Sequence, residues 1–360
     1  MERFSYAHGG TLTNHEQGLC VHEFLTCARV HEVDRTRRAE GAPRAMDDAN
    51  ARETSGDDSC SWWRACGFPT RAKCVDVVVN DDEVGPQKVR LVVRYKNLDT
   101  TTTTRTRTAE EDEEEEEEFT MDPYFFDPGY TIAATTGFCR VWEGAETLSK
   151  FLMADAGRVR GKKCVELGAG VGECGLVAAT IGAHVVLTDV HAVAENVIRR
   201  NVGTNGCGDA ARFGADAWPR SARVGRGSAT HATLDWFDPI PETPFGGEHN
   251  ENFYDAEVIL AAECVWLRDL VPAFVETNRA LLSRGVEKEL ILSFRDRSST
   301  DDAASGKAFA GYREVVRAFE DAGHVCEVLQ RTASIEDVGK EIIIYRVTRR
   351  RDNAEESNHR

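Results

Sequence analysis

The stretch Val165-Glu-Leu-Gly-Ala-Gly-Val-Gly-Glu-Cys-Gly175 decides the fold of this chain of 360 residues. It predicts a short buried strand that ends in Glu166, a tight turn, and a helix that begins near Glu173. The turn contains three alternating glycines, which are Gly168, Gly170 and Gly172. Glycine permits positive φ angles and leaves no Cβ atom between the backbone and a docked ligand. Because the helix N-terminus directs free N–H groups and its positive dipole end toward the same crevice, the stretch predicts the ligand-binding edge of an open α/β sheet.

The carboxylate of Glu166 helps to decide which ligand this edge binds. Residues 170–175 form a literal G-x-G-x-x-G, which also occurs in dinucleotide-binding turns, although that motif alone is a weak signal. A carboxylate at the strand end repels a pyrophosphate and attracts a cationic amino-acid group. S-adenosylmethionine carries a sulfonium and an ammonium group and no phosphate, so it fits better than a nicotinamide dinucleotide.

A second predicted strand, residues 184–189, ends in another carboxylate, that of Asp189. An acidic side chain in this place can accept hydrogen bonds from both hydroxyls of a ribose. The alternative is that Asp189 only caps the helix predicted to start near His191, as aspartate does readily. Asp189 therefore indicates a ribosyl cofactor more firmly than it indicates which one.

Strands alternate with helices along the rest of the chain, which predicts a parallel sheet. Further strands are predicted over residues 230–234, 257–262, 290–294, 325–329 and 341–345. Helices are predicted up to residue 152, after a lead-in loop from residue 137, and over 191–202, 269–282 and 307–322. The last two strands are joined by an 11-residue loop without a helix, so they predict an antiparallel edge. We therefore expect an α/β fold with a doubly wound, Rossmann-like sheet of seven strands and an antiparallel terminal pair, with loops at 207–227 and 239–250.

The remaining sequence predicts appendages around this main domain, which we place at residues 119–348. Residues 1–72 are polar and lack a sustained apolar period, so we expect them to be poorly ordered. Two alternating runs, 73–80 and 88–95, predict a β-hairpin within 73–96. Residues 97–118 end in a run of acidic residues and predict a flexible linker, with recruitment of a basic partner as the alternative. Residues 349–360 predict a disordered tail.

Charge and cysteine content limit the partners. The net charge of −17 disfavours direct contact with nucleic acid and is compatible with a basic protein substrate. No apolar run reaches the ~18 residues typical of a membrane span, so we expect no membrane segment. The 11 cysteines are odd in number and lack C-x-x-C pairs, which predicts no metal site and a reducing compartment. We expect a monomer in the cytoplasm, with the nucleus as a second location.

Five motifs stand out between residues 125 and 348. They are 141–145 with its Trp142, 166–172, 187–189, the Leu-Asp-Trp of 234–236, and 259–266. Together they resemble the seven-strand S-adenosylmethionine-dependent methyltransferases. The tryptophan lead-in and the Leu-Asp-Trp triplet are most similar to the branch that methylates lysines of non-histone proteins. The resemblance implies S-adenosylmethionine as the cofactor.

The resemblance also implies how the cofactor is bound. Trp142 would close over it, residues 168–170 would wrap its amino-acid end, and Asp189 would bind its ribose. Trp236 would lie against the adenine, which an indole just past a strand end can do by stacking, and Ala262 would line the pocket. The alternative is that Trp142 and Trp236 are half-buried core residues. The complete predicted set is Trp142, Glu166, Gly168, Ala169, Gly170, Gly172, Asp189, Asp235, Trp236 and Ala262.

On the substrate side, the family has Asp-x-x-Tyr or Asp-x-x-Phe after the fourth strand, where this chain has Glu263-Cys-Val-Trp266. The change keeps a carboxylate and an aromatic ring at the same spacing. We predict that Glu263 orients an acceptor amine and that Trp266 walls its channel through the π face of the indole. The alternatives are that Glu263 caps the next helix and that Trp266 packs against it. Arg295 and Asp296 are weaker candidates to face the substrate.

These observations favour transfer of a methyl group to a lysine of a basic or lysine-bearing protein. A second possibility keeps the chemistry and changes the acceptor to histidine or a small amine, because the Glu/Trp pair is larger than that of the family. A third is a non-catalytic subunit that binds the cofactor and scaffolds a partner. A nicotinamide-dependent oxidoreductase is least favoured, since nothing downstream of residue 175 resembles a hydride-transfer site.

Overall fold

The computed structural model describes residues 70–81, 85–96, 137, 140–209, 218, 221–242, 244–245, 251–284, 287–297 and 309–350. The chain divides into two compact units, Met1–Gly56 and Asp57–Arg360, and all of these residues belong to the second. The predictions for residues 1–69, for the acidic linker and for the tail after residue 350 lie outside the described residues. The start of the main domain at residue 119 stays a prediction for the same reason.

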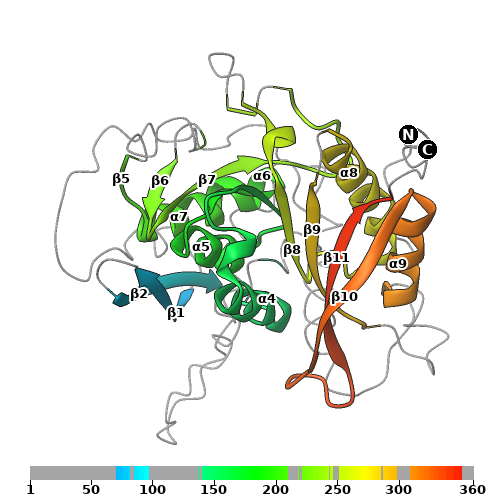
Figure 1. Ribbon diagram of the computed structural model, residues 1–360, viewed down its shortest axis with the longest axis horizontal. Coiled ribbons are helices and arrows are strands. Elements are labelled where there is room, and N and C mark those ends of the chain that lie inside the picture. Colours follow the sequence, from blue (N-terminus) through cyan, green and yellow to red (C-terminus); the bar gives the residue numbers. More distant parts are fainter. Residues whose placement is uncertain are drawn as a thin grey trace, which may run out of the picture. The chain divides into compact units, whose positions relative to one another are not determined.

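A mixed sheet forms the centre of this unit, with the strand order β10-β11-β9-β8-β3-β4-β7-β6-β5 (Figure 1). The seven predicted strands correspond to β3 Lys163–Leu167, β4 His184–Asp189, β7 Gly227–Thr233, β8 Val258–Ala262, β9 Glu289–Arg295, β10 His324–Ala333 and β11 Glu341–Arg349. The strands from β9 through β8, β3 and β4 to β7 are parallel. The pairs β10-β11 and β11-β9 are antiparallel. The α/β class, the parallel centre and the antiparallel terminal pair are therefore confirmed.

Three details differ from the prediction. Two short strands, β5 Cys207–Asp209 and β6 Ala222–Val224, extend the sheet to nine strands within the predicted loop 207–227, because the chain doubles back from β6 into β7 through a tight turn. Strand β10 continues to pair with β11 as far as Ala333, so the connection between them is 334–340 rather than 11 residues. Helix α9, Tyr312–Asp321, begins late because the preceding Phe309 forms an extended bridge with Leu267.

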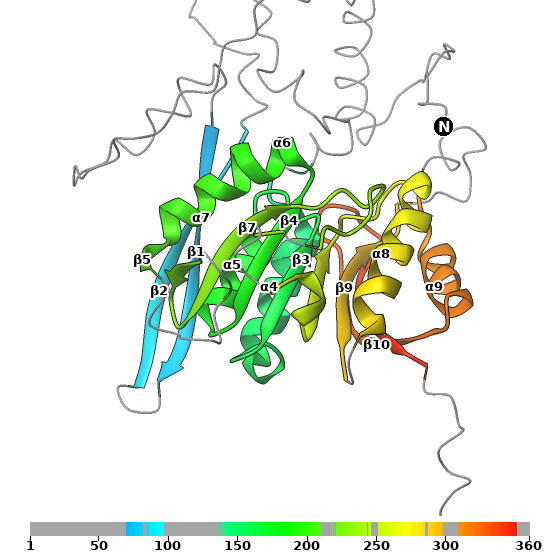
Figure 2. The ribbon, with the colours of Figure 1, turned by 90° about the horizontal axis from the view of Figure 1, so that it is seen from above.

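Helices cover both faces of the sheet (Figure 2). One face carries α4 Glu143–Ala154, α5 Glu173–Thr180, and a continuous segment of α6 His191–Val193, the π-helical turn Ala194–Ile198 and α7 Arg199–Asn205. The other face carries α8 Val271–Ser283, with a proline in its first turn as predicted, and α9. Short 3₁₀ turns occupy Ala156–Arg158, Phe253–Asp255 and Arg268–Leu270. The carboxyl ends of the parallel strands meet at one edge, which is where ligands bind in such sheets.

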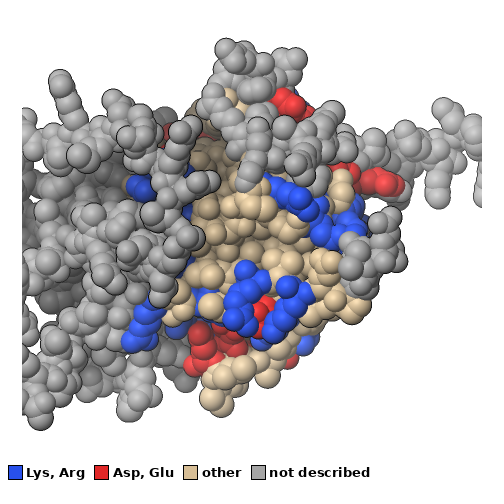
Figure 3. Space-filling view, turned by 90° about the vertical axis from the view of Figure 1, so that its left-hand side faces the viewer, with Lys and Arg blue, Asp and Glu red and all other residues tan. Residues whose placement is uncertain are grey.

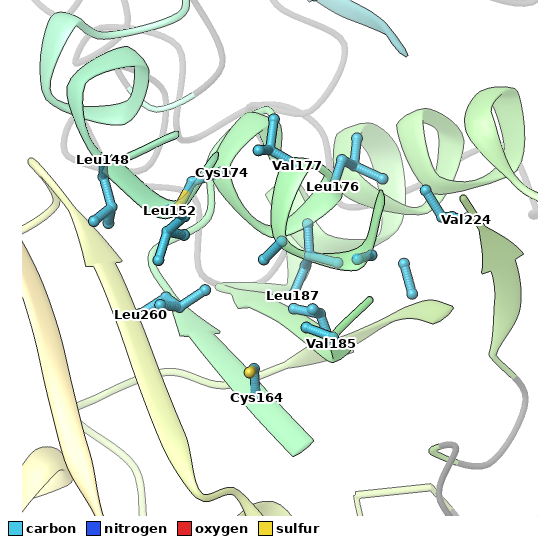
Figure 4. Packing of buried hydrophobic residues seen from close by; sticks show 14 of the residues in the cluster. Leu148, Leu152, Cys164, Cys174, Leu176, Val177, Val185, Leu187, Val224 and Leu260 are labelled. Carbon is cyan, nitrogen blue, oxygen red and sulfur yellow. The ribbon is translucent and has the colours of Figure 1, made fainter. Parts of the chain in front are cut away.

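Alternate residues of the central strands point to opposite faces and fill two hydrophobic cores. On β8, Val258 and Leu260 belong to the core beneath α4 and α5, whereas Ile259 and Ala261 belong to the core beneath α8 and α9. Figure 4 shows residues of the first core from the sheet (Cys164, Val185, Leu187, Val224, Leu260), from α4 (Leu148, Leu152) and from α5 (Cys174, Leu176, Val177). Because both faces are buried, these strands are nearly continuous apolar runs in the sequence.

The predicted hairpin is present and longer than predicted, with β1 Thr70–Asp81 paired to β2 Gly85–Lys96. Its buried side chains join the first core and are Val77, Val79, Leu91 and Val93. Lys73 forms ion pairs with Glu146 of α4 at 2.7 Å and with Glu173 of α5 at 2.8 Å. The hairpin is therefore a third layer outside α5 and α7. On the side of the molecule that carries the hairpin, Lys and Arg side chains form separate groups around a broad area of other residues (Figure 3).

Two asparagines of α7 pair with the backbone of β2 in the way that a further strand would. Asn201 accepts a hydrogen bond from the N–H of Arg94 and donates one to its carbonyl oxygen, both at 3.0 Å. Asn205 makes the same pair with Val92, at 2.7 and 2.8 Å. Residues four apart on a helix share a face, and residues two apart on a strand share an edge, so the two spacings match.

Asn201→Ala is expected to loosen the hairpin from α7. Asn201 also donates to the carbonyl oxygen of Val171 at 2.8 Å, so the change leaves three backbone groups without this partner. We expect a loss of about 3 kcal/mol in the free energy of unfolding, because unpaired buried polar groups cost roughly 1–3 kcal/mol each and some will find water. Urea unfolding measures the loss, with the exposed Thr204→Ala on the same helix as the control. Equal stability of the two variants would contradict this account.

Candidate active site

The glycine turn after β3 lies at the carboxyl edge of the sheet. Gly168 has φ of 61°, and a Cβ atom there would lie 2.6 Å from the Cβ of Cys264. Gly170 has φ of 56°, and a Cβ atom there would lie 2.5 Å from the carbonyl oxygen of Gly137. No other side chain fits at either position unless the surroundings move. The turn therefore presents bare backbone to the space beyond β3.

A cavity opens between this turn and the ends of β4, β7 and β8. It is lined by most of the predicted site residues, namely Trp142, Glu166, Gly168, Ala169, Gly170, Asp189, Asp235, Trp236, Ala262, Glu263 and Trp266. Gly172 is outside this lining, because it precedes α5 and faces Leu187. Arg295 and Asp296 are outside it as well, and Asp296 accepts a hydrogen bond from the N–H of Tyr312 at 3.1 Å instead.

Several lining residues were missed by the sequence reasoning. They are Gly137, Arg140, Ala145, Val171, Glu173, Val190, Leu234, Phe237, Cys264 and Leu270. Val171 lies inside the motif 166–172, between two predicted glycines, and Val190 and Phe237 each directly follow a motif, so extending those two motifs by one residue finds them. Leu270 carries no such signal, because it reaches the cavity from the segment before α8.

Two strand-end carboxylates are held by backbone N–H groups. Asp189 accepts from the N–H of Gly170 at 2.9 Å and from the N–H of Val190 at 2.8 Å. Glu166 accepts from the N–H of Gly175 at 2.9 Å. Burial raises the pKa of Asp189 to about 6 and the pKa of Glu166 to about 8, and the N–H donors oppose the rise in both. Carboxylates kept from water in this way favour a ligand that brings hydroxyl donors or a positive charge.

Aromatic rings line the cavity on two sides. The ring of Trp236, which follows β7, packs against Phe274 of α8 with centroids 5.0 Å apart. Trp142 stands at the N-terminus of α4, where the guanidinium carbons of Arg140 and Arg297 lie 4.1 and 4.4 Å from its ring centroid. Both indoles are partly buried. A flat apolar group such as a purine can pack on the exposed part of such a ring.

Glu263 follows the end of β8 in a conformation that is rare outside glycine, with φ of 54°. Its side chain is buried, and one oxygen, Oε2, accepts from the N–H of Gly144 at 2.8 Å. The other, Oε1, accepts from Nε of Arg295 at 2.8 Å and from Nη2 of Arg297. Gly144 allows this approach, because a Cβ atom there would lie 2.8 Å from Oε2. Backbone strain of this kind clusters at functional sites.

An ion-pair network extends from Glu263 to the β10–β11 connection. The Arg295 guanidinium also donates to Glu143 at 3.2 Å and to Glu336 at 3.1 Å. Glu143 accepts from the hydroxyl of Ser334 and from the N–H of Ile335, both at 2.6 Å. Because both oxygens of Glu263 are bonded within this network, its predicted contact with an acceptor amine stays a prediction.

Residues 133–305 match the lysine methyltransferase family. These residues belong to that family. The match covers the lead-in to α4, the glycine turn, the strand ends that line the cavity and the end of β9.

The lysine methyltransferase domain is similar to several named proteins. It is 32% identical to protein N-lysine methyltransferase METTL21A of Danio rerio over 163 residues, which are 45% of this chain and 62% of that protein. Methyltransferase-like protein 22 of Homo sapiens is 31% identical over 46% of this chain and 41% of that protein. EEF1A lysine methyltransferase 3 of Xenopus tropicalis is 29% identical over 44% and 57%. The chain thus spans less than two thirds of the length of these relatives.

Among solved structures, the chain is similar to magnesium protoporphyrin IX methyltransferase of Synechocystis PCC 6803 with bound SAM. The sequence identity is 15%, the TM-score is 0.35, and the similarity covers 62% of this chain and 87% of that chain.

The cavity of the lysine methyltransferase domain fits S-adenosylmethionine, the cofactor of this class of enzyme. Each oxygen of Asp189 accepts one backbone N–H and keeps a lone pair for a ribose hydroxyl. Trp236 offers a flat ring for the adenine, and the bare turn at residues 168–170 leaves room for the amino-acid end. Glu166 adds a buried carboxyl group that holds its proton at neutral pH in the ligand-free protein and that a nearby cation would favour in its ionised form. These are the residues that would hold the cofactor.

Within the residues that the structure describes, no group of three or more His, Cys, Asp or Glu side chains could hold a metal ion. Among the helices of the same residues, none is long and apolar enough to cross a membrane.

Glu166→Gln is expected to remove a loss of stability that occurs as pH rises from about 5 to about 8. The folded pKa of about 8 lies above the ordinary 4.5, so between these values the folded state holds a proton that the unfolded state has released. Stability of the ligand-free protein therefore falls as pH rises from about 5 to about 8, by about 3 kcal/mol for this group. Urea unfolding of both proteins across this pH range measures the difference. Parallel pH profiles would contradict the prediction.

Proposed function

We propose that this protein is an enzyme that transfers a methyl group from S-adenosylmethionine to a lysine side chain of a protein. The observation that carries the proposal is one cavity with two differently equipped parts. Asp189 and Trp236 suit a nucleoside, whereas Glu263 and Trp266 combine a carboxylate with an indole, which suits a cationic amine. The family match and the two relatives named for lysine methylation support the same acceptor.

When bound, S-adenosylmethionine supplies an electrophilic methyl group on a cationic sulfur. The residues of this chain bind, align and exclude water, which is where most of the acceleration of a direct displacement arises. Asp189 and the glycine turn hold the donor, and Trp142 covers it. A lysine with a pKa of about 10.4 must first lose its proton, at a cost of roughly 4–5 kcal/mol at pH 7. Arg295, bonded to Glu263, lowers the pKa of an amine placed beside it.

We also propose that the protein acts as a monomer on basic or lysine-bearing protein rather than on nucleic acid. The net charge of −17 supports a basic protein over nucleic acid as the partner, because it repels phosphate backbones. We propose a location in the cytoplasm, with the nucleus as a second compartment, on the basis of the unpaired cysteine pattern.

The test is to incubate the purified full chain with methyl-labelled S-adenosylmethionine and a protein extract, and to identify the labelled amino acid after hydrolysis. We expect methyllysine. Methylhistidine would indicate that the acceptor is the imidazole side chain of histidine and not lysine. Binding of S-adenosylmethionine in a calorimeter without transfer to any protein would favour the scaffold function instead.

A further inference from the structure

A cation lies against three residues that line the acceptor part of the cavity. The guanidinium carbon of Arg297 lies 4.4 Å from the ring centroid of Trp142 and 5.9 Å from that of Trp266. The same guanidinium donates a hydrogen bond to Oε1 of Glu263. Glu263 and Trp266 are the groups proposed to receive the lysine, and Trp142 is the indole proposed to cover the donor beside them. Two indoles with a carboxylate are a typical environment for an organic cation.

Arg297 is less completely bonded than its neighbour Arg295. The side chain of Arg297 is 17% exposed, and its Nε is buried with no hydrogen-bond partner among the residues that the structure describes. Burial lowers the pKa of this guanidinium, against the attraction of Glu263. Arg295 is more deeply buried and donates to Glu263, Glu143 and Glu336. The two arginines therefore have different roles, one built into the network and one beside it.

The carboxylate of Glu263 can exchange one cation for another without loss of charge balance. A carboxylate oxygen accepts about two hydrogen bonds, and Oε1 already accepts from Arg295 and Arg297. If Arg297 leaves, Arg295 and the N–H of Gly144 still hold the carboxylate, and one position on Oε1 becomes open. Arg297 lies two residues beyond the end of β9, so its departure breaks no pairing of the sheet.

We infer that Arg297 is an internal occupant of the acceptor site: its guanidinium takes the place of the substrate ammonium between Glu263, Trp142 and Trp266, and an acceptor lysine must displace it. This inference rests on the proposed function for the choice of lysine. The occupied state lowers the apparent affinity for any acceptor by the fraction of molecules in which the site is open. Arg297 thereby lowers the apparent affinity of the site most consequentially for free amines and weakly bound lysines, whose binding is too weak to displace it.

The first test measures binding and needs no methyl transfer. The full chain and its Arg297→Met variant are titrated with Nα-acetyl-lysine amide, and binding is followed by ligand-detected NMR. We expect the variant to bind about tenfold more tightly, as when an occupied fraction of about 90% is freed. Nα-acetyl-norleucine amide, which has no charge, should gain nothing. Arg279→Met removes an exposed arginine paired with Glu276 and serves as the matched control.

Equal or weaker binding of Nα-acetyl-lysine amide to a folded Arg297→Met protein would overturn the inference and make Arg297 a positioning residue for Glu263. Circular dichroism and thermal unfolding show whether the variant is folded. Because this comparison is independent of turnover, it separates the two proposals. A wild-type protein that methylates no lysine refutes the proposed function, whereas an unchanged affinity in the variant refutes only the inference.

The second variant, Arg297→Lys, keeps a cation in the site and remains informative if the methionine variant does not fold. Its ammonium group would stand where the acceptor stands, so incubation with S-adenosylmethionine should methylate Lys at position 297 of the variant itself. Peptide mapping by mass spectrometry locates the modification, and a rate per molecule that is independent of protein concentration shows that it is intramolecular. Methylation of added protein without methylation at position 297 would overturn the inference.

Discussion

Asp189→Ala is expected to weaken S-adenosylmethionine binding by about 100-fold or more. The Asp189 carboxylate has two tasks in the cavity. It holds the N–H groups of Gly170 and Val190, which shapes the turn, and it keeps one lone pair on each oxygen for the ribose hydroxyls. Hydrogen bonds to a charged acceptor contribute roughly 1.5–3 kcal/mol each, so the loss of two costs about 3 kcal/mol or more. The freed N–H groups can still find water at the cavity surface.

Calorimetric titration with S-adenosylmethionine and with S-adenosylhomocysteine measures the effect. Both ligands carry the ribose, so both should lose affinity to the same extent. Asp155→Ala is the matched control, because it removes an exposed carboxylate that is paired with Arg158. If the variant binds both ligands as the wild type does, the ribose does not bind at Asp189, and it must bind away from the end of β4. Loss of binding of S-adenosylmethionine alone would indicate that Asp189 acts on the sulfonium charge instead.

The part of the cavity around the glycine turn was predictable from sequence because it is built from short local rules. A strand, a glycine turn and a helix N-terminus are contiguous in the chain, and their geometry follows from residues 165–175. Asp189 and Trp236 each follow a strand of recognisable pattern, and parallel strands bring their carboxyl ends to one edge. Gly172 shows the limit of this reasoning, since it belongs to the same motif and yet faces Leu187 rather than the cavity.

The remaining features depend on contacts between distant segments. The Asn201 and Asn205 amides match the β2 edge only because the hairpin, about 110 residues earlier, packs outside α7. Strands β5 and β6 are too short for a periodic signal. Strand β6 forms because β7 offers it an edge, and β5 then pairs with β6. The Glu143–Arg295–Glu336 network joins three elements that no local pattern connects. The sequence contains these residues but no spacing that relates them.

Glu263 depends both on a local sequence rule and on contacts between distant segments. Its place after β8 and its carboxylate were predicted, whereas its bonding to Arg295 and Arg297 was not. The network changes the physical meaning of a substitution at this position, because the side chain is a buried counter-ion as well as a proposed contact of the acceptor.

Glu263→Gln is therefore expected to reduce both stability and turnover. A glutamine keeps an oxygen for the N–H of Gly144 but leaves the buried Arg295 without its nearest charge partner. Breaking a buried ion pair from one side costs about 3–5 kcal/mol in the free energy of unfolding. Turnover should fall below detection, because the proposed acceptor pair of residues 263 and 266 then has no carboxylate to hold the amine. Affinity for S-adenosylmethionine should change little, since Asp189 and Trp236 stay in place.

The control for this experiment is Glu276→Gln, which changes an exposed carboxylate that is also paired with an arginine, Arg279. Exposed pairs of this kind contribute little to stability, so the control should unfold as the wild type does. Urea unfolding and a methyl-transfer assay on the same three proteins separate the two tasks of Glu263. Lower stability with normal turnover would make Glu263 a structural counter-ion only, and the acceptor amine would then need another anion. Normal stability with lost turnover would instead mean that Arg295 is held well enough by Glu143 and Glu336, and that the charge of Glu263 serves the acceptor.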